Sequence, residues 1–263
     1  MSRRTVGAPP RVVIVIAAVG LVIFFVVPLA GLVARAPWTH LAREISAPAV
    51  TTALVLSLIC STGATALSLA FGVPLAWLLA RGTFPGRGLL RALATLPLVV
   101  PPVVGGVALL LAFGRRGIIG AHLPFRLTFT TPGAILAETF VAMPFCVLTI
   151  EAALRSLDRG YEEIAATLGS GPLRTFTRVT LPLIAPSVAS GAALTFARAL
   201  GEFGATITFA GNLPGRTQTL PLAVYVALET NPDAAIALSL VLLAVSIAVI
   251  AILGRRTLFD ARR

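Results

Sequence analysis

Arg198 and Glu202 carry opposite charges inside a long apolar stretch of the sequence. Helix residues four apart lie on one face, so these two side chains can form an ion pair. Gly201, Gly204 and Ala205 nearby are small and would leave room for a neighbouring helix or a passing ion. A charge at membrane depth marks a functional site by default. The pair therefore either lines a path for a charged solute or fixes helix packing.

Other residues that could do covalent or metal chemistry are sparse. Cys60 and Cys146 lie in apolar segments, where a small thiol is usually packing material. No cluster of His, Cys and carboxylates indicates a metal site or a catalytic centre. The 21 basic residues are all arginine, so the lysine that a G-x-x-x-x-G-K-[ST] phosphate loop requires is missing. We expect no catalytic residue, no metal and no cofactor on this chain.

The composition is that of a membrane protein. Of 263 residues, 57% are hydrophobic and 12% charged, against roughly 25% charged in a typical soluble domain. Several uncharged runs reach the roughly 20 residues that an α-helix needs to cross a bilayer. The net charge of +11 would favour nucleic acid in a soluble protein, but these arginines lie mostly between apolar runs. We expect contact with lipid and none with nucleic acid.

The apolar runs predict an all-α polytopic protein of about six transmembrane helices, with one membrane domain over about 48–254. The expected spans are 12–34, 51–80, 92–113, 132–154, 185–210 and 234–253. They are framed by a basic tail over 1–11, a loop over 155–184 and a tail over 254–263. Thr131 is expected to cap the fourth span ahead of Pro132.

Prolines interrupt the third span at Pro101 and Pro102, close to Gly105. Each proline removes a backbone hydrogen bond that lipid cannot replace, so this helix is expected to break or kink where protein surrounds it. The bent element either lines a transport path or is a kinked packing helix. Our candidates for the path are Pro101, Pro102, Gly105, Arg198, Gly201, Glu202 and Gly204.

The arginines predict the orientation of the chain in the membrane. The larger set follows the even-numbered spans and the tails: Arg3, Arg4, Arg11, Arg81, Arg87, Arg91, Arg155, Arg159, Arg174, Arg178, Arg255, Arg256, Arg262 and Arg263. The smaller set lies on the other face: Arg35, Arg43, Arg115, Arg116, Arg126 and Arg216. Arginine-rich short connections stay in the cytoplasm. Both termini and the 155–184 loop are therefore expected to be cytoplasmic.

The polar segment 161–182 predicts a knob of two short helices. Acidic residues in an early turn favour a helix over 158–168, and Gly169 with Pro172 would end it. A second helix over 173–180 would end at Leu181-Pro182. The alternative is an amphipathic helix resting on lipid, but that helix would carry a cationic face, and the first half of this segment is acidic.

This segment, YEEIAATLGSGPLRTFTRVTLP, resembles the coupling motif of type I ATP-binding-cassette (ABC) importer permeases, with Ile164 and Val179 as mild departures. Two further segments, Leu96–Gly120 and Arg198–Tyr225, are similar to the molybdate permeases, which are close to the sulfate and thiosulfate permeases. The resemblance extends from about residue 48 to the last span. The stretch AGNLPGRTQTLPLAVY is more like the molybdate branch, and tungstate is not distinguished from molybdate.

The resemblance implies a homodimer in the bacterial inner membrane, two copies of a cytoplasmic ATPase that uses the ATP, and an extracytoplasmic molybdate-binding protein. Small residues and a carboxylate would let the ATPase approach the loop, with these residues as candidates: Glu162, Glu163, Ala165, Ala166, Gly169, Leu181 and Pro182. The candidates for contact with the binding protein are Asn212, Arg216, Thr217 and Gln218.

Three other functions stay open at this point. A sulfate or thiosulfate ABC permease is the nearest alternative. A secondary anion transporter would show inverted repeats with broken helices in both halves, whereas only the third span is clearly broken by proline. A membrane enzyme would need clustered His, Asp or Glu at membrane depth, which the sequence does not offer.

Overall fold

The computed structural model describes residues 11–260. The outer parts of the two expected tails, residues 1–10 and 261–263, lie outside the described residues. The described chain consists of helices and their connections: α1 (Arg11–Ala34), α2 (Leu41–Ile45), α3 (Pro48–Arg81), α4 (Arg87–Thr95), η1 (Leu96–Leu98), α5 (Pro102–Phe113), η2 (Gly120–His122), α6 (Thr131–Ser156), α7 (Gly160–Thr167), α8 (Pro172–Thr175), η3 (Phe176–Thr180), α9 (Leu181–Leu200), α10 (Gly204–Phe209), α11 (Leu220–Thr230) and α12 (Pro232–Asp260).

Five helices of the described chain are long and apolar enough to cross a membrane, and a bent pair makes a possible sixth span. The bent pair is the expected third span, in which segments 87–98 and 102–113 meet at 116°. The break includes Pro101, which has an extended ψ of 133°. Pro102 then begins the second segment. The predicted break of this span is therefore confirmed.

The fifth span was expected to be one helix over 185–210, and this prediction is wrong. The helix α9 ends at Leu200, and α10 begins at Gly204. The Glu202 carboxylate, which follows the end of α9, accepts the backbone N–H of Ala205 at 2.9 Å and thereby satisfies a free donor at the start of α10. The charged residue that interrupts the apolar run is part of a helix break.

The second helix of the knob was expected to end at Leu181-Pro182, and this prediction is wrong. Helix α8, the π-helical turn η3 and α9 follow one another without a gap from Pro172 to Leu200. Proline is tolerated at the start of a helix, and Pro182 lies in the first turn of α9. The knob therefore continues directly into a membrane span.

Two smaller expectations also change. Thr130, not Thr131, caps α6, because its Oγ1 accepts the N–H of Gly133 at 3.2 Å. The connection before the last span contains a helix, α11, that was not expected from the sequence.

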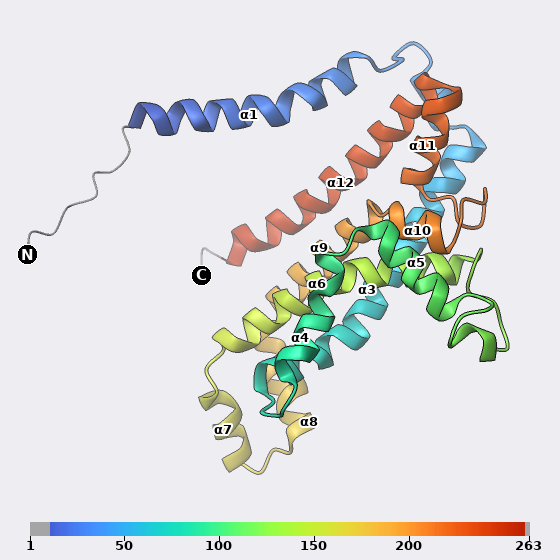
Figure 1. Ribbon diagram of the computed structural model, residues 1–263. Helices are drawn as coiled ribbons and strands as arrows, with labels where there is room; N and C mark the ends of the chain where they lie inside the picture. The colour runs from blue at the N-terminus through green and yellow to red at the C-terminus, as the bar shows by residue number, and fades with distance from the viewer. Residues whose placement is uncertain (1–10, 261–263) are drawn as a thin grey trace, which may run out of the picture.

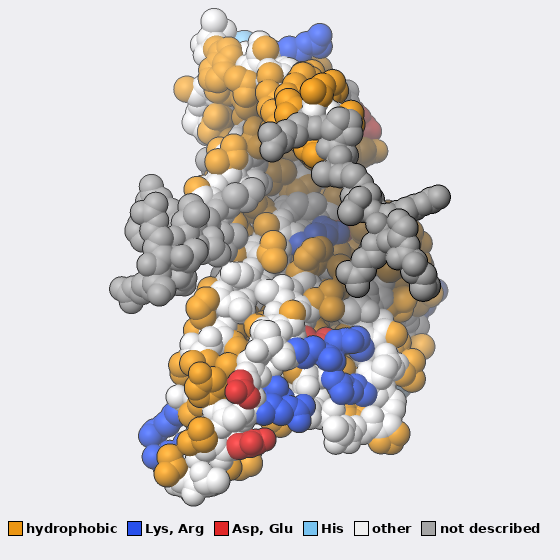
Figure 2. All heavy atoms as spheres, turned by 90° about the vertical axis from the view of Figure 1, so that its left-hand side faces the viewer, with side chains coloured by type: hydrophobic (Ala, Val, Ile, Leu, Met, Phe, Trp, Pro, Cys, Tyr) orange, Lys and Arg blue, Asp and Glu red, His pale blue; other side chains and the backbone are white. Residues whose placement is uncertain are grey.

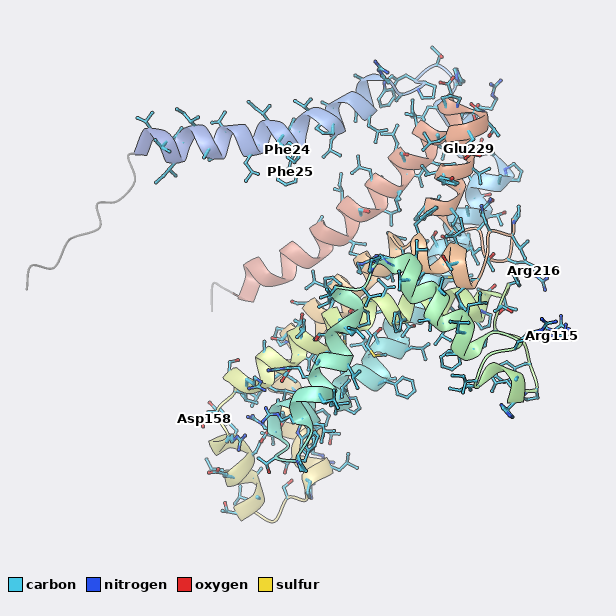
Figure 3. The ribbon with its side chains drawn as sticks, viewed as in Figure 1. Phe24, Phe25, Arg115, Asp158, Arg216 and Glu229 are labelled. Carbon is cyan, nitrogen blue, oxygen red and sulfur yellow. The ribbon has the colours of Figure 1, made fainter. Side chains whose placement is uncertain are left out.

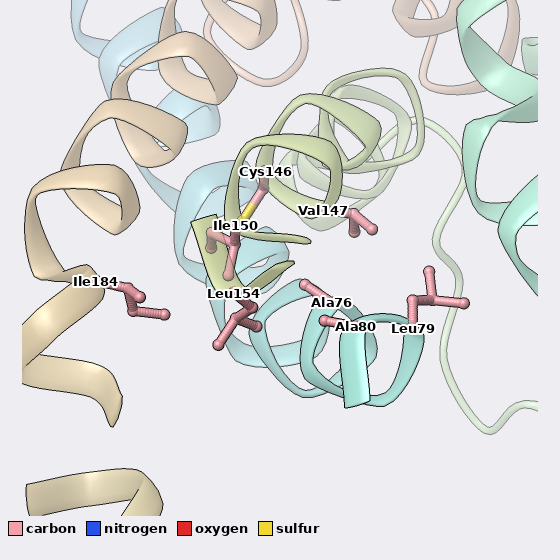
Figure 4. Close-up of a cluster of buried hydrophobic side chains, with 8 residues drawn as sticks. All are labelled: Ala76, Leu79, Ala80, Cys146, Val147, Ile150, Leu154 and Ile184. Carbon is pink, nitrogen blue, oxygen red and sulfur yellow. The ribbon is translucent and has the colours of Figure 1, made fainter. Parts of the chain in front are cut away.

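A seam of small side chains on α3 packs against α6. The seam repeats every fourth residue, which is the spacing of one helix face, and all of its members are buried: Cys60, Ala64, Ser68, Gly72, Ala76 and Ala80. A Cβ atom on Gly72 would lie 3.3 Å from Cys146 Sγ, so the two backbones are close. Small residues drive helix association in lipid, because they permit this close packing. Larger side chains fill the seam at the C-terminal end of α3, where Ile150 and Leu154 of α6 and Ile184 of α9 belong to one buried cluster with Ala76, Leu79 and Ala80 (Figure 4).

The helix α1 lies away from the bundle formed by the other long helices (Figure 1). None of its apolar window is buried, and Phe24 and Phe25 are 70% and 61% exposed. The helices α7 and α8 form one end of the molecule, and α11 lies at the opposite end (Figure 1). Most of the coupling candidates therefore lie at the α7 end.

Candidate coupling surface and translocation path

Helix α7, at one end of the molecule, carries four of the seven coupling candidates; Gly169 follows it, and Leu181 and Pro182 begin α9. Glu163 and Ala166 are exposed, and Ala165 is half-buried. Gly169 follows the helix with a φ of +81°, a left-handed conformation that glycine adopts without strain. The N–H groups of Gly169 and Ser170 bond to the carbonyls of Ala166 and Ala165, which closes the helix in a Schellman motif. A short and largely exposed helix results.

Glu162 faces the interior, unlike Glu163. Its Oε1 accepts the Thr180 hydroxyl at 3.0 Å, and its Oε2 lies 3.2 Å from Arg81 Nε. Arg81 also donates from Nη2 to the carbonyl of Leu157 at 3.2 Å. One carboxylate thus joins α7 to the end of α3 and to the start of α9.

A second carboxylate ties the same end together. Glu151 is 1% exposed and accepts hydrogen bonds from two arginines, Arg91 on α4 and Arg155 one turn further along α6. Arg155 also donates to the carbonyl of Leu79 at 3.3 Å. This cluster was not expected from the sequence, although the spacing of Glu151 and Arg155 is a local signal for an ion pair. Figure 2 shows arginine side chains gathered in this part of the molecule.

The Arg198–Glu202 pair forms, although not on one helical face. Arg198 Nη2 lies 2.6 Å from Glu202 Oε2, while the Glu202 side chain is 1% exposed and that of Arg198 is 28% exposed. Glu202 lies beyond the end of α9, so the pair spans the break between α9 and α10. The ion pair with Arg198 and the hydrogen bond from the Ala205 N–H offset part of the cost of burying this carboxylate. This geometry fits a pair that lines a transport path and equally a pair that fixes helix packing.

Glycines bring the two broken spans together. A Cβ atom on Gly204 would lie 3.0 Å from Pro102 Cβ, and one on Gly106 would lie 2.7 Å from Thr208 Cβ. Gly105 instead faces α6, where a Cβ atom would lie 2.9 Å from Phe140. Gly105 and Gly204 therefore sit in tight helix contacts, whereas Pro101 and Gly201 are exposed.

A further buried carboxylate lies in α6. Glu138 is 1% exposed, and its Oε2 has no hydrogen-bond partner among the described residues. Glu138 and Glu202 are close enough to interact electrostatically, and Ser61 of α3 is within hydrogen-bonding reach of Glu138. Three spans therefore contribute polar groups to one buried region.

The connection after α10 contains the four candidates for contact with the binding protein, which differ in exposure. Arg216 is exposed, whereas Asn212 and Gln218 are half-buried. Thr217 is fully buried, and its hydroxyl accepts the N–H of Leu213 at 2.9 Å. The prediction that Thr217 contacts a partner is therefore wrong, because its side chain holds the turn from within.

The connection after α5 lies beside this turn. Thr131 Oγ1 donates to the carbonyl of Arg216 at 2.9 Å, and Figure 3 shows Arg115 and Arg216 on the same edge of the molecule. Arg115, Arg116 and Arg126 are all exposed. Together with Arg216 they form a positive rim, and Figure 3 shows Arg115 and Arg216 far from Asp158 at the α7 end.

The geometry combines a protruding helix at one end, broken spans in the middle and a basic rim at the other end. Comparison with known families identifies this arrangement. The family described as "Binding-protein-dependent transport system inner membrane component" matches residues 72–259. The chain belongs to this family. The match includes α7, both helix breaks and α11, and it makes the chain a multi-pass component of an inner-membrane transport system.

Several curated relatives are similar over most of the chain. The molybdenum transport system permease protein ModB of Mycobacterium tuberculosis (strain ATCC 25618 / H37Rv) is 47% identical over 251 residues, covering 94% of this chain and 95% of the relative. ModB of Escherichia coli (strain K12) is 46% identical over 205 residues, covering 76% and 90%. The sulfate transport system permease protein CysT of the same strain is 37% identical over 232 residues, covering 86% and 84%.

A solved structure has the same fold at low sequence identity. It is a bacterial alginate ABC transporter in complex with an alginate pentasaccharide-bound periplasmic protein. One of its chains superposes with a TM-score of 0.73 and 19% identity, covering 93% of this chain and 92% of that one. The predicted all-α ABC-importer permease fold is therefore confirmed.

Proposed function

We propose that this chain is the permease subunit of an ATP-driven molybdate importer. The observation that carries the proposal is the similarity to molybdenum permeases along nearly the whole chain, at a higher identity than to the sulfate permease. Sulfate and thiosulfate transport is the second candidate, because the sulfate relative also covers most of the chain. Tungstate is an expected second cargo, since it is an oxyanion of the same shape and charge.

The proposed complex contains two copies of this chain, two copies of a cytoplasmic ATPase and an extracytoplasmic molybdate-binding protein. The periplasmic protein bound to the structurally similar alginate transporter supports a partner of this kind. The absence of lysine supports a separate ATPase, because the chain has no phosphate loop of its own. In this arrangement the chain binds no cofactor and catalyses no reaction, and ATP is hydrolysed by the partner.

The two ends of the structure fit the two partners. The exposed face of α7 around Glu163 and Gly169 is the surface offered to the ATPase. The arginine rim at the outer end, which includes Arg216, is offered to the binding protein or to the oxyanion that it releases. Positive charge attracts an oxyanion and raises the rate at which the oxyanion meets this rim.

Uptake by reconstituted vesicles tests the proposal. Vesicles would hold this chain with its ATPase, with ATP inside and the molybdate-loaded binding protein outside. We expect ATP-dependent molybdate uptake that tungstate inhibits at lower concentrations than sulfate does. Preferential uptake of sulfate would favour the second candidate. Uptake that follows an ion gradient without ATP would contradict an ABC importer and support a secondary transporter.

A further inference from the structure

Glu162 and Glu163 are adjacent in α7 but have different surroundings. Glu163 is exposed and has no ion-pair partner among the described residues. The Glu162 side chain is 23% exposed and that of its partner Arg81 is 9% exposed. A pair so shielded from water is screened less by salt than a surface pair. Glu162 therefore makes a stable internal contact that Glu163 does not make.

The partners of Glu162 belong to the elements that enter the membrane. Arg81 is the last residue of α3, and Thr180 is the last residue of the π turn that leads into α9. Arg81 Nε lies 3.3 Å from Oε1 and 3.2 Å from Oε2 of Glu162, so the guanidinium bridges both oxygens. The contact from Arg81 to the Leu157 carbonyl extends the connection to the end of α6. A displacement of Glu162 would act on three spans.

Apolar packing does little to hold α7 in place. None of its residues is buried, and a cavity of about 260 Å³ lies between α7 and the following helix. Trp77, Glu162, Ala166 and Phe176 are among the residues that line this cavity. Because the space behind α7 is hollow, the bonds of Glu162 are the specific link between α7 and the spans.

The following helix contains a π turn at the point where Glu162 attaches. The turn η3 covers Phe176–Thr180, and its last residue supplies the hydroxyl that Glu162 accepts. π turns are rare and often occur at functional sites. A pull on Thr180 would act on this irregular turn, directly before α9.

We propose that Glu162 is a positioning residue that transmits the displacement of α7 to α3 and α9, whereas Glu163 belongs to the surface that the partner holds. This inference rests on the proposed function, because it requires an ATPase that moves α7. Loss of Glu162 would leave the partner bound while the movement no longer reaches the spans. Loss of Glu163 would weaken the attachment itself.

The test uses the full complex of this chain with its ATPase and binding protein. Three variants are compared: Glu162→Gln, Glu163→Gln and Thr180→Val. Two quantities are measured, the amount of ATPase that co-purifies and the stimulation of ATP hydrolysis by the oxyanion-loaded binding protein. We expect Glu162→Gln to keep co-purification and to lose stimulation by about tenfold, a typical allosteric coupling. Thr180→Val should act in the same direction but less, and Glu163→Gln should reduce co-purification.

Normal stimulation in Glu162→Gln would overturn the inference, and so would an equal loss of co-purification in Glu162→Gln and Glu163→Gln. If Glu162→Gln fails to insert into the membrane, the Thr180→Val variant provides the test, because it removes only one hydroxyl group. Unchanged stimulation of ATP hydrolysis in Thr180→Val would then overturn the inference.

The wild-type complex separates a failure of this inference from a failure of the proposed function. If only sulfate-loaded binding protein stimulates it, the cargo is wrong, but the comparison of the variants still holds. If no ATPase co-purifies with it, both proposals fail.

Discussion

Gly204 and Pro102 stand at the breaks of two different spans and lie in direct contact. A Cβ atom on Gly204 would lie 3.0 Å from Pro102 Cβ and 3.2 Å from the backbone nitrogen of Val103. The starts of α5 and α10 therefore pack together with no space for a larger residue. Irregular backbone at membrane depth is tolerated only inside protein or beside a cavity. The break in the third span and the break in the fifth span therefore cover each other.

Enlarging Gly106 should disturb this contact. A Cβ atom there would lie 2.7 Å from Thr208 Cβ and 2.9 Å from the Ala205 carbonyl oxygen. We expect Gly106→Ala to lower stability by about 1–3 kcal/mol through overpacking. The melting temperature of the purified complex in detergent measures the effect. Gly191→Ala is the control, because its Cβ atom would lie at an ordinary 3.4 Å from Thr149 Cβ. Equal melting temperatures for the two variants would contradict the predicted strain.

Removing one charge of the Arg198–Glu202 pair should be worse than removing both. Arg198→Gln leaves a buried carboxylate without its cation, which costs about 3–5 kcal/mol when no other group compensates. The double variant Arg198→Gln/Glu202→Gln has no unpaired charge, and the new amide oxygen can still accept the N–H of Ala205. Uptake by vesicles should therefore fall most in the single variants. Equal loss in all three would show that the charges act separately.

Glu151 should contribute more to stability than an exposed carboxylate does. Glu151→Gln weakens charged hydrogen bonds from Arg91 and Arg155, each contributing about 1.5–3 kcal/mol at most. Both arginines are about two-fifths exposed, so water offsets part of that loss. Glu229→Gln is the control, since Glu229 is exposed and forms no ion pair among the described residues. A melting temperature that falls as much for Glu229→Gln would contradict the role of burial.

The sequence predicted features whose cause is local. The break at Pro101-Pro102 follows from two missing N–H groups, and the end of α7 follows from Gly169. The break after Leu200 was missed, because Arg198 and Glu202 fit a helix equally well. Its local signal was an acidic residue three positions ahead of Ala205, which is the spacing of a helix cap.

Contacts between distant residues could not be predicted in this way. Glu162 was expected on the coupling surface, since nothing in its own segment distinguishes it from Glu163. Its partner Arg81 is 81 residues away, and only the packing of α3 beside the knob brings them together. The same holds for Arg91 and Glu151, which are 60 residues apart.

Reversing the charge of Arg216 should weaken the response to the binding protein. Arg216 is exposed on the rim that also carries Arg115, Arg116 and Arg126. A surface charge acts mainly on the rate of association, so Arg216→Glu should slow binding and make it less sensitive to salt. Association kinetics at low and moderate ionic strength measure this. Thr217→Val is not a suitable probe, because Thr217 is buried. Unchanged kinetics in Arg216→Glu would show that the rim is a solvated loop only.

Changes on the exposed face of α7 should detach the ATPase without preventing membrane insertion. Glu163→Arg reverses an exposed charge, and Gly169→Leu places a branched side chain at a φ of +81°, which costs roughly 1–2 kcal/mol. Neither change touches the buried seam between α3 and α6, so the membrane domain should still assemble. Glu229→Arg is the control, an exposed carboxylate at the opposite end of the molecule (Figure 3). Pull-down of the ATPase from solubilised membranes should fail for Glu163→Arg and Gly169→Leu and succeed for Glu229→Arg. Retained pull-down in both α7 variants would show that α7 does not hold the ATPase.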